Sequence, residues 1–191
     1  MAFIADKLSK IKPSATMSLS AKVAELKRMG KDIIALGAGE PNFDTPDHIK
    51  EAGIEAIKSG KTKYTTVDGI FELKEAIQKK FKRDNNLEYG LDQITVNCGG
   101  KHTIYNTLFA TLNEGDEVII PAPYWVSYEE IIKMAEGIPV FIETSIENDF
   151  KISPQQLRNA ISSKTKMMIY SSPCNPSGSV YSKEELRSLA D

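Results

Sequence analysis

The stretch that decides the fold is Gly115 to Tyr128, with the sequence GDEVIIPAPYWVSY. The short apolar run from Val118 to Ile120 predicts a buried strand. A loop with two prolines and Trp125 follows, and the next residues, 126–135, predict a helix. A short strand followed closely by a helix is typical of a βαβ unit, in which neighbouring strands run parallel.

The same alternation extends in both directions from this stretch. Further strands are predicted at residues 94–97, 138–142 and 166–170, and a helix is predicted from the Gly99-Gly100 pair through Leu112. Capping boxes at residues 153–156 and 182–185 predict two more helix starts. The chain is therefore expected to be an α/β protein, with a three-layer arrangement of a mostly parallel sheet and helices on both faces.

The N-terminal part of the chain lacks this rhythm. Residues 18–29, 46–59 and 69–81 predict helices, and the second of these is expected to bury Ile49 and Ile57. We expect residues 1–45 to form an N-terminal arm and part of a small domain, and residues 46–191 to form the first part of a large domain. The last helix has barely begun at the end of the chain, so the chain is expected to be a fragment.

Composition excludes several classes of function. The 191 residues are 41% hydrophobic and 26% charged, as in ordinary globular proteins. With 24 basic and 26 acidic residues the net charge is −2, which gives no basic surface for nucleic acid. No apolar run is long enough to span a membrane. The two cysteines have no metal-ligand spacing, and a cytoplasmic location is the default expectation.

Three unusual loops follow predicted strands, where ligands bind in open parallel sheets. The turn at residues 97–101 places two glycines before a helix, which suits a phosphate but also fits a plain tight turn. The loop at 121–125 carries the single tryptophan, which suits ligand stacking or core packing. The loop at 172–178 holds Asn175 between two prolines, and these residue types are also common in ordinary turns.

Taken together and in order, these motifs resemble a known family. The chain resembles the N-terminal half of a class I (fold type I), aspartate-type aminotransferase that depends on pyridoxal phosphate, and specifically the bacterial aspartate/prephenate branch. The resemblance rests on the following stretches: Leu36–Pro41, Phe43–Pro46, Lys63-Tyr64, Gly69, Glu72-Leu73, Gly99–Lys101, Gly115–Ile120, Pro123–Tyr128, Ser172-Pro173, Asn175-Pro176 and Gly178.

The resemblance implies a role for each matching residue. Some of these residues are implied to contact the phosphate or the ring of the cofactor. One is implied to contact the cofactor phosphate of the neighbouring subunit in a homodimer. Other residues are implied to contact the two carboxylates of a dicarboxylate substrate, or to allow the binding of prephenate. The implied cofactor residues are Gly99, Gly100 and Lys101 (phosphate), Trp125 (ring stacking), Asn175 (ring 3-oxygen) and Tyr64 (neighbouring subunit); the implied substrate residues are Gly39, Trp125, Asn175, Lys101 and Lys12.

The implied reaction moves an amino group between aspartate or glutamate and a 2-oxo acid: 2-oxoglutarate, oxaloacetate or prephenate. In the family, the lysine that forms a Schiff base with the cofactor lies beyond the end of this chain. Ser18–Lys22 is out of register with that motif. The resemblance thus implies no catalytic residue and no metal in this chain, which is expected to be inactive alone. The alternatives are a cofactor-docking half that needs a complementary C-terminal half, or a non-functional fragment.

Overall fold

The fold is built on three parallel strands. The computed structural model describes residues 3–37 and 39–191, so Ala38 of the Leu36–Pro41 motif lies outside the described residues. Among those residues, β1 (Glu117–Ala122) pairs with β2 (Ile138–Glu143) on one side and β3 (Thr165–Met168) on the other, in the order β2-β1-β3. Both pairs are parallel, as the sequence predicts.

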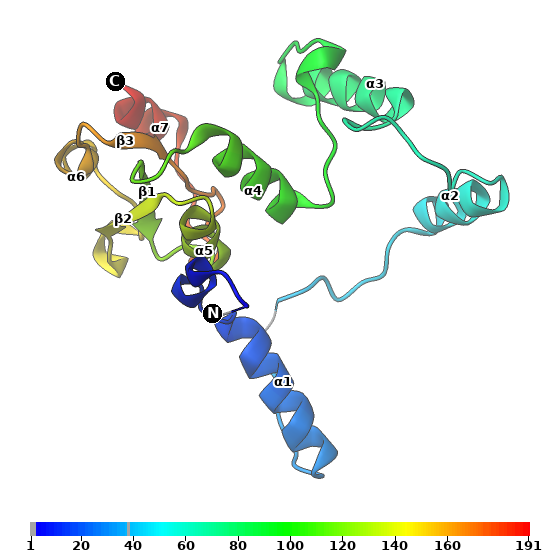
Figure 1. Ribbon diagram of the computed structural model, residues 1–191, viewed down its shortest axis with the longest axis horizontal. Coiled ribbons are helices and arrows are strands. Elements are labelled where there is room, and N and C mark those ends of the chain that lie inside the picture. Colours follow the sequence, from blue (N-terminus) through cyan, green and yellow to red (C-terminus); the bar gives the residue numbers. More distant parts are fainter. Residues whose placement is uncertain (1–2, 38) are drawn as a thin grey trace. The chain divides into compact units, whose positions relative to one another are not determined.

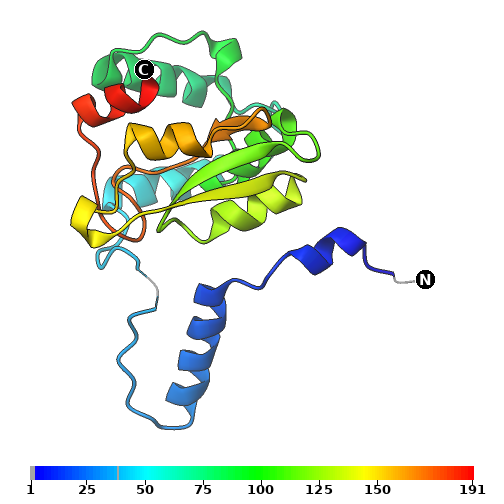
Figure 2. The same ribbon diagram turned by 90° about the vertical axis from the view of Figure 1, so that its left-hand side faces the viewer.

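Helices cover both faces of this sheet (Figures 1 and 2). They are α4 (Gly100–Thr111), α5 (Ser127–Met134), α6 (Pro154–Ala160) and α7 (Lys183–Ala190). Both predicted capping boxes are confirmed, because Ser153 and Ser182 accept the backbone N–H groups of Gln156 and Glu185. The expected three-layer α/β architecture is therefore confirmed.

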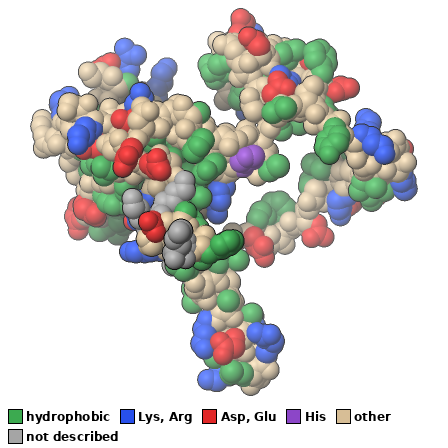
Figure 3. All heavy atoms as spheres, viewed as in Figure 1, with side chains coloured by type: hydrophobic (Ala, Val, Ile, Leu, Met, Phe, Trp, Pro, Cys, Tyr) green, Lys and Arg blue, Asp and Glu red, His purple; other side chains and the backbone are tan. Residues whose placement is uncertain are grey.

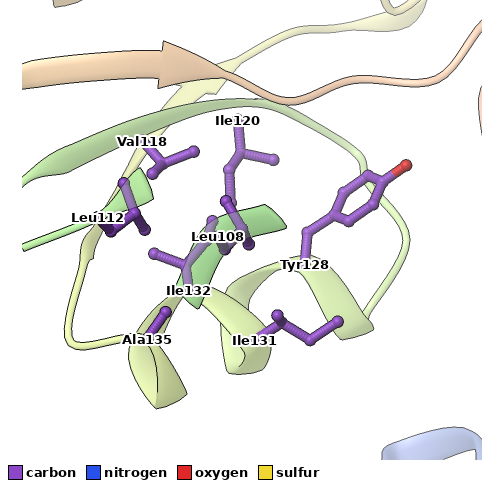
Figure 4. Close-up of a cluster of buried hydrophobic side chains, with 8 residues drawn as sticks. All are labelled: Leu108, Leu112, Val118, Ile120, Tyr128, Ile131, Ile132 and Ala135. Carbon is purple, nitrogen blue, oxygen red and sulfur yellow. The ribbon is translucent and has the colours of Figure 1, made fainter. Parts of the chain in front are cut away.

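Alternating residues of β1 fill two separate cores. Val118 and Ile120 face α4 and α5 (Figure 4), whereas Ile119 faces the opposite core, which includes residues of α6 and α7. All three side chains are almost completely buried. Successive strand residues point to opposite faces, so a strand covered on both faces must be apolar at every position. Burial on both faces therefore explains the continuous apolar run from which this strand was predicted.

The N-terminal segments and the remaining helices are largely exposed. They comprise a 3-10 helix η1 (Asp6–Lys10), α1 (Ala15–Arg28), α2 (Asp47–Lys58) and α3 (Phe71–Lys80), which a π-helical turn at Phe81–Asn85 extends; two further 3-10 turns lie at Leu91–Gln93 and Ile146–Asn148. Among the described residues, no helix is both long and apolar enough to cross a membrane.

The chain divides into two compact units, one of residues 1–32 with 104–191 and one of residues 33–103. The expected domain boundary near residue 45 is not tested by this division and stays a prediction. Hydrophobic side chains lie on the surface of the second unit over α2 and α3 (Figure 3).

Two predictions for the second unit are wrong. No residue of α2 is buried, and Ile57 is 69% exposed, because helical periodicity identifies an apolar face but not a partner for it. Residues 94–97 form no strand among the described residues. The Val96 N–H donates to Asp68 O at 3.0 Å, but no neighbouring strand supplies the ladder that a strand requires.

We predict that the core around β1 dominates the stability of the unit formed by residues 1–32 and 104–191. Ile132 of α5 is fully buried against Val118 and Ile120, so Ile132→Ala is expected to lower the free energy of unfolding by about 2–5 kcal/mol. Urea unfolding followed by the fluorescence of Trp125 measures this. The control is Ile146→Ala, at a site 73% exposed, where a change below about 0.5 kcal/mol is expected. Equal losses in both variants would contradict the assignment of the core.

Candidate functional site

The loops after β1 and β3 lie at the same edge of the sheet. Because the strands are parallel neighbours, their carboxyl ends meet there, and ligands bind at this edge in open α/β sheets. The loop at 121–125 begins with the last two residues of β1 and continues beyond it, and the loop at 172–178 follows β3. The Cys174 thiol donates to the carbonyl oxygen of Pro123 at 3.4 Å. The structure therefore brings together two of the three loops that the sequence singled out.

The loop at 172–178 is held by its own hydrogen bonds. The Cys174 N–H donates to Ser179 O at 2.9 Å, and the Gly178 N–H donates to Cys174 O at 2.8 Å. Asn175 lies exposed within this closed turn, and its N–H donates to the Ser171 hydroxyl oxygen at 3.3 Å. A gap of only about 10 Å³ remains beside Pro123 and Cys174, barely the space of one water. The two loops therefore form a packed support for Asn175.

The sequence position of Trp125 allowed core packing or ligand stacking, and its surroundings in the structure fit both. Its ring lies edge-on to Tyr128, with centroids 5.4 Å apart, and packs against the core cluster of α4, α5 and β1. The side chain is only half-buried. One part of the indole is therefore fixed by the core, and another part lies at the surface.

A network of three side chains holds the residue before Trp125. The Tyr124 hydroxyl donates to Glu129 Oε2 at 2.7 Å, and Lys133 Nζ donates to the other carboxylate oxygen. The hydrogen bond from Lys133, and then that from Tyr124, holds the pKa of Glu129 below its usual value. Hydrogen bonding to Glu129 raises the pKa of Lys133, whereas burial and the same carboxylate raise the pKa of Tyr124. All three groups therefore keep their protonation states at neutral pH.

The third loop, at residues 97–101, lies in the unit of residues 33–103 and leads into α4. Gly99 has φ of +85°, a conformation that other residues adopt only with strain. No atom lies within 4 Å of the position that a Cβ would take at Gly99 or Gly100. The backbone is thus open beside a helix N-terminus, whose positive dipole end favours an anion. His102 is exposed, and its Nδ1 accepts the Cys98 N–H at 3.3 Å.

The other predicted residues are distributed over both units. Gly39, Tyr64 and Lys101 are exposed in the unit of residues 33–103. Lys12 lies in the other unit, where its N–H donates to Glu130 Oε2 at 2.9 Å. The structure thus groups Lys12, Trp125 and Asn175 in one unit, and Gly39, Tyr64, Gly99, Gly100 and Lys101 in the other. The roles that the resemblance implies for them stay predictions.

Glu129, Glu130 and Lys133, which contact Tyr124 and Lys12, are functional candidates that the sequence did not indicate. Their spacing of three and four residues on one helix is a signal for ion pairs, but it does not indicate the tyrosine and the arm that join them. Both cysteines, Cys98 and Cys174, are free thiols. Among residues 3–37 and 39–191, no cluster of three or more His, Cys, Asp or Glu side chains could hold a metal ion.

Comparison with known proteins identifies the family. The sequence model of the family described as "Aminotransferase class I and II" matches residues 31–191. The chain belongs to this aminotransferase family. The resemblance that the motifs indicated is thereby confirmed, and it holds over most of the chain.

Several relatives of this aminotransferase chain carry specific names. A "Probable aspartate/prephenate aminotransferase" of Rickettsia bellii is 58% identical over 100% of this chain and 48% of its own length. An "Aspartate/prephenate aminotransferase" of Nitrosomonas europaea is 58% identical over 97% of this chain and 47% of its own length. The solved aspartate aminotransferase of Thermus thermophilus with maleate has a TM-score of 0.96 at 46% identity, over 100% of this chain and 50% of that one. The chain therefore spans about half the length of the relatives it matches.

We predict that the Glu129 network stabilises the aminotransferase chain only while Glu129 is ionised. Its pKa is lower in the folded than in the unfolded protein, so the contribution is complete above about pH 4.5 and is lost as the pH falls through the lowered value. Glu129→Gln is expected to cost about 1 kcal/mol of unfolding free energy at neutral pH, and progressively less as the pH falls below about 4.5. Urea unfolding at several pH values, followed by Trp125 fluorescence, gives the difference.

The control for this experiment is Glu51→Gln on the exposed surface of α2, which should leave the unfolding free energy unchanged at every pH. A cost for Glu129→Gln that does not decrease as the pH is lowered well below 4.5 would show that the charge of Glu129 has no part in the network.

Proposed function

We propose that the chain is the N-terminal portion of an aspartate/prephenate aminotransferase. The whole enzyme transfers an amino group between aspartate or glutamate and a 2-oxo acid such as 2-oxoglutarate, oxaloacetate or prephenate. The observation that carries this proposal is the 58% identity, over the full length of the chain, with a relative of that name. The TM-score of 0.96 with an aspartate aminotransferase supports it independently.

The cofactor in this proposal is pyridoxal phosphate, which when bound supplies an electron sink for reactions at the amino-acid α-carbon. The turn at Gly99 and Gly100 fits its phosphate, because the space beside both glycines is open and the N-terminus of α4 follows. Lys101 adds a positive charge for the phosphate and for the distal carboxylate of a dicarboxylate substrate. These contacts need no side chain at positions 99 and 100, which accounts for the glycines.

The loops after β1 and β3 orient the cofactor ring and the substrate. The indole of Trp125 would stack on the ring, and the contact with Tyr128 would keep the indole in its orientation. Asn175 would donate a hydrogen bond to the 3-oxygen of the ring and help to orient the substrate carboxylate, and the backbone of Gly39 would contribute to binding that carboxylate. The contact of the Cys174 thiol with the Pro123 carbonyl oxygen joins the two loops.

The remaining residues act at the edges of the site. Tyr64, which is fully exposed in the chain, reaches the phosphate bound by the second subunit of a homodimer. Lys12 of the N-terminal arm contributes to the acceptance of prephenate. The enzyme works in the cytoplasm, and the two free cysteines agree with a reducing compartment.

The isolated chain is inactive in this proposal, because no lysine within it takes the cofactor-linked role. Lys22 follows a serine-rich stretch, but it lies on the exposed helix α1 and pairs with Glu25 at 2.9 Å. The chain therefore contributes binding and orientation. The group that accepts and returns the substrate proton belongs to the part of the enzyme that follows in its relatives.

We expect the chain to bind pyridoxal phosphate through the phosphate and to catalyse no transfer. Titration followed by Trp125 fluorescence should show saturable binding of pyridoxal phosphate, and binding of pyridoxal at least about tenfold weaker, because phosphate contacts are charge-assisted. Borohydride should fix no cofactor on a specific lysine, and aspartate with 2-oxoglutarate should give no oxaloacetate. Turnover, or a specific lysine adduct, would overturn the assigned absence of the catalytic lysine. Equal affinity for both compounds would overturn the phosphate site.

Gly99→Ala tests the phosphate turn within the same experiment. An alanine at φ of +85° strains the backbone by about 1 kcal/mol or more, so the affinity for pyridoxal phosphate should fall about fivefold or more. Gly30→Ala is the matched control, because Gly30 has φ of +79°, open surroundings and a position at the end of α1. It should leave the affinity unchanged.

A second candidate function is a docking half that becomes active with a complementary polypeptide. Two observations favour it: β3 is an edge strand among the described residues, and α2 presents an exposed apolar face. Unpaired strand edges and apolar patches are surfaces that bind other chains. The occupant in this proposal is a polypeptide equivalent to the remaining half of the relatives.

We expect the chain to form a 1:1 complex with the separately expressed remaining portion of the Nitrosomonas europaea relative, and the complex to show transfer activity. Gel filtration and an aspartate–2-oxoglutarate assay measure both. Ile57→Ser on the apolar face of α2 should weaken the complex, whereas Lys58→Ser on the same helix should not. If the two polypeptides elute separately at all concentrations, the docking function is wrong.

A further inference from the structure

The N-terminal arm is attached to helix α5. The 3-10 helix η1 packs against α5, and just after it the Lys12 N–H donates to Glu130 Oε2 at 2.9 Å. The two residues are 118 positions apart in the sequence. Pro13 follows Lys12, and α1 begins only at Ala15, so Lys12 lies outside both helices. The carboxylate of Glu130 thus holds the N-terminal arm at Lys12, where the arm is extended and not helical.

Glu130 is itself held in place. Its side chain is only 21% exposed, and its other oxygen is 3.4 Å from Lys133 Nζ. It lies in the first turn of α5, where the helix dipole favours a negative charge. A carboxylate fixed by a lysine and by a helix dipole is a rigid acceptor, because neither oxygen is free to rotate away. The hydrogen bond to the arm is therefore directional.

The same turn of α5 also holds the loop that carries Trp125. Glu129, the neighbour of Glu130, accepts the Tyr124 hydroxyl, and Lys133 contacts both carboxylates. The positive charge of Lys12 also contributes to the lowered pKa of Glu129. One helical turn thus positions the arm through Glu130 and the Trp125 loop through Glu129.

We propose that Glu130 is the positioning residue that docks the N-terminal arm and thereby fixes Lys12 beside the Trp125 loop. The bond uses the backbone nitrogen of Lys12, so it leaves the side-chain ammonium group for a substrate carboxylate. Glu130 does not touch the substrate and acts only through Lys12. The role of Lys12 toward substrate rests on the proposed function, whereas the docking itself does not.

Hydrogen exchange of the arm, measured by mass spectrometry on peptides from residues 3–14 without cofactor, tests the docking. Glu130→Ala should speed the exchange of the Lys12 amide about tenfold or more, because a charge-assisted hydrogen bond is lost. Glu130→Gln keeps an oxygen acceptor and should restore slow exchange to within about threefold of the original chain. Glu51→Ala on α2 is the remote control and should change nothing.

A second variant separates docking from a general loss of structure. Lys12→Pro removes the donor N–H without altering α5, and the other amides of residues 3–14 should exchange faster in this variant as well. Peptides covering β1 should keep their protection in every variant. Unchanged exchange of the arm in both Glu130→Ala and Lys12→Pro overturns the proposal, as does fast exchange in Glu130→Gln equal to that in Glu130→Ala.

The result of the hydrogen-exchange experiment does not depend on the result of the pyridoxal phosphate titration. If pyridoxal phosphate fails to bind but Glu130→Ala releases the arm, the docking stands and the proposed function fails. If pyridoxal phosphate binds but the arm exchanges equally fast in all variants, the proposed function stands and the role of Glu130 fails.

Discussion

Burial of β1 on both faces is the constraint on which the rest of this structure depends. Val118 and Ile120 need one layer of helices and Ile119 needs another, so a single strand of three large apolar residues organises α4, α5, α6 and α7 around it. At about 25 cal/mol per Å² of buried apolar surface, these contacts outweigh any single hydrogen bond in the loops. The parallel pairing with β3 then brings the loops after both strands to one edge. The contact between Cys174 and Pro123 is a consequence of that register.

Electrostatic interactions refine what the core has arranged. Two adjacent carboxylates at the start of α5 would repel each other, but Lys133 and the helix dipole compensate their charge. Their remaining oxygens accept the hydroxyl of Tyr124, from the loop just before the helix, and the N–H of Lys12, which lies 118 residues from Glu130 in the sequence. Each such bond contributes about 1 kcal/mol, too little to create a fold but enough to select one position of a loop or an arm. Rigidity near Trp125 therefore has a polar origin as well as an apolar one.

The sequence predicted those features whose causes are local. The capping boxes at Ser153 and Ser182 satisfy backbone donors within four residues, so they form wherever the helix forms. The strand at 117–122 was also predictable, because a strand buried on both faces leaves a continuous apolar run. Residues 94–97 alternate apolar and polar side chains, as a half-buried strand does, yet they form no strand, because a ladder needs a neighbour that no local pattern supplies. Glu130 was missed for the same reason, since its partner lies 118 residues away.

The candidate site contains residues of both kinds: some are positioned by the neighbouring sequence, and others by contacts with distant residues. The turn at Gly99 depends on one backbone conformation and on the start of α4, so its capacity for an anion is encoded in a few consecutive residues. The positions of Trp125 and Asn175 depend instead on β1, β3 and α5, and hence on contacts between residues about 50 positions apart, such as Cys174 and Pro123. A substitution near Gly99 should therefore alter one contact, whereas a substitution in the core should displace several at once. The family motifs in the loops of Trp125 and Asn175 are short and far apart in the sequence. They come together in space only because the strands of the sheet hold the loops at one edge.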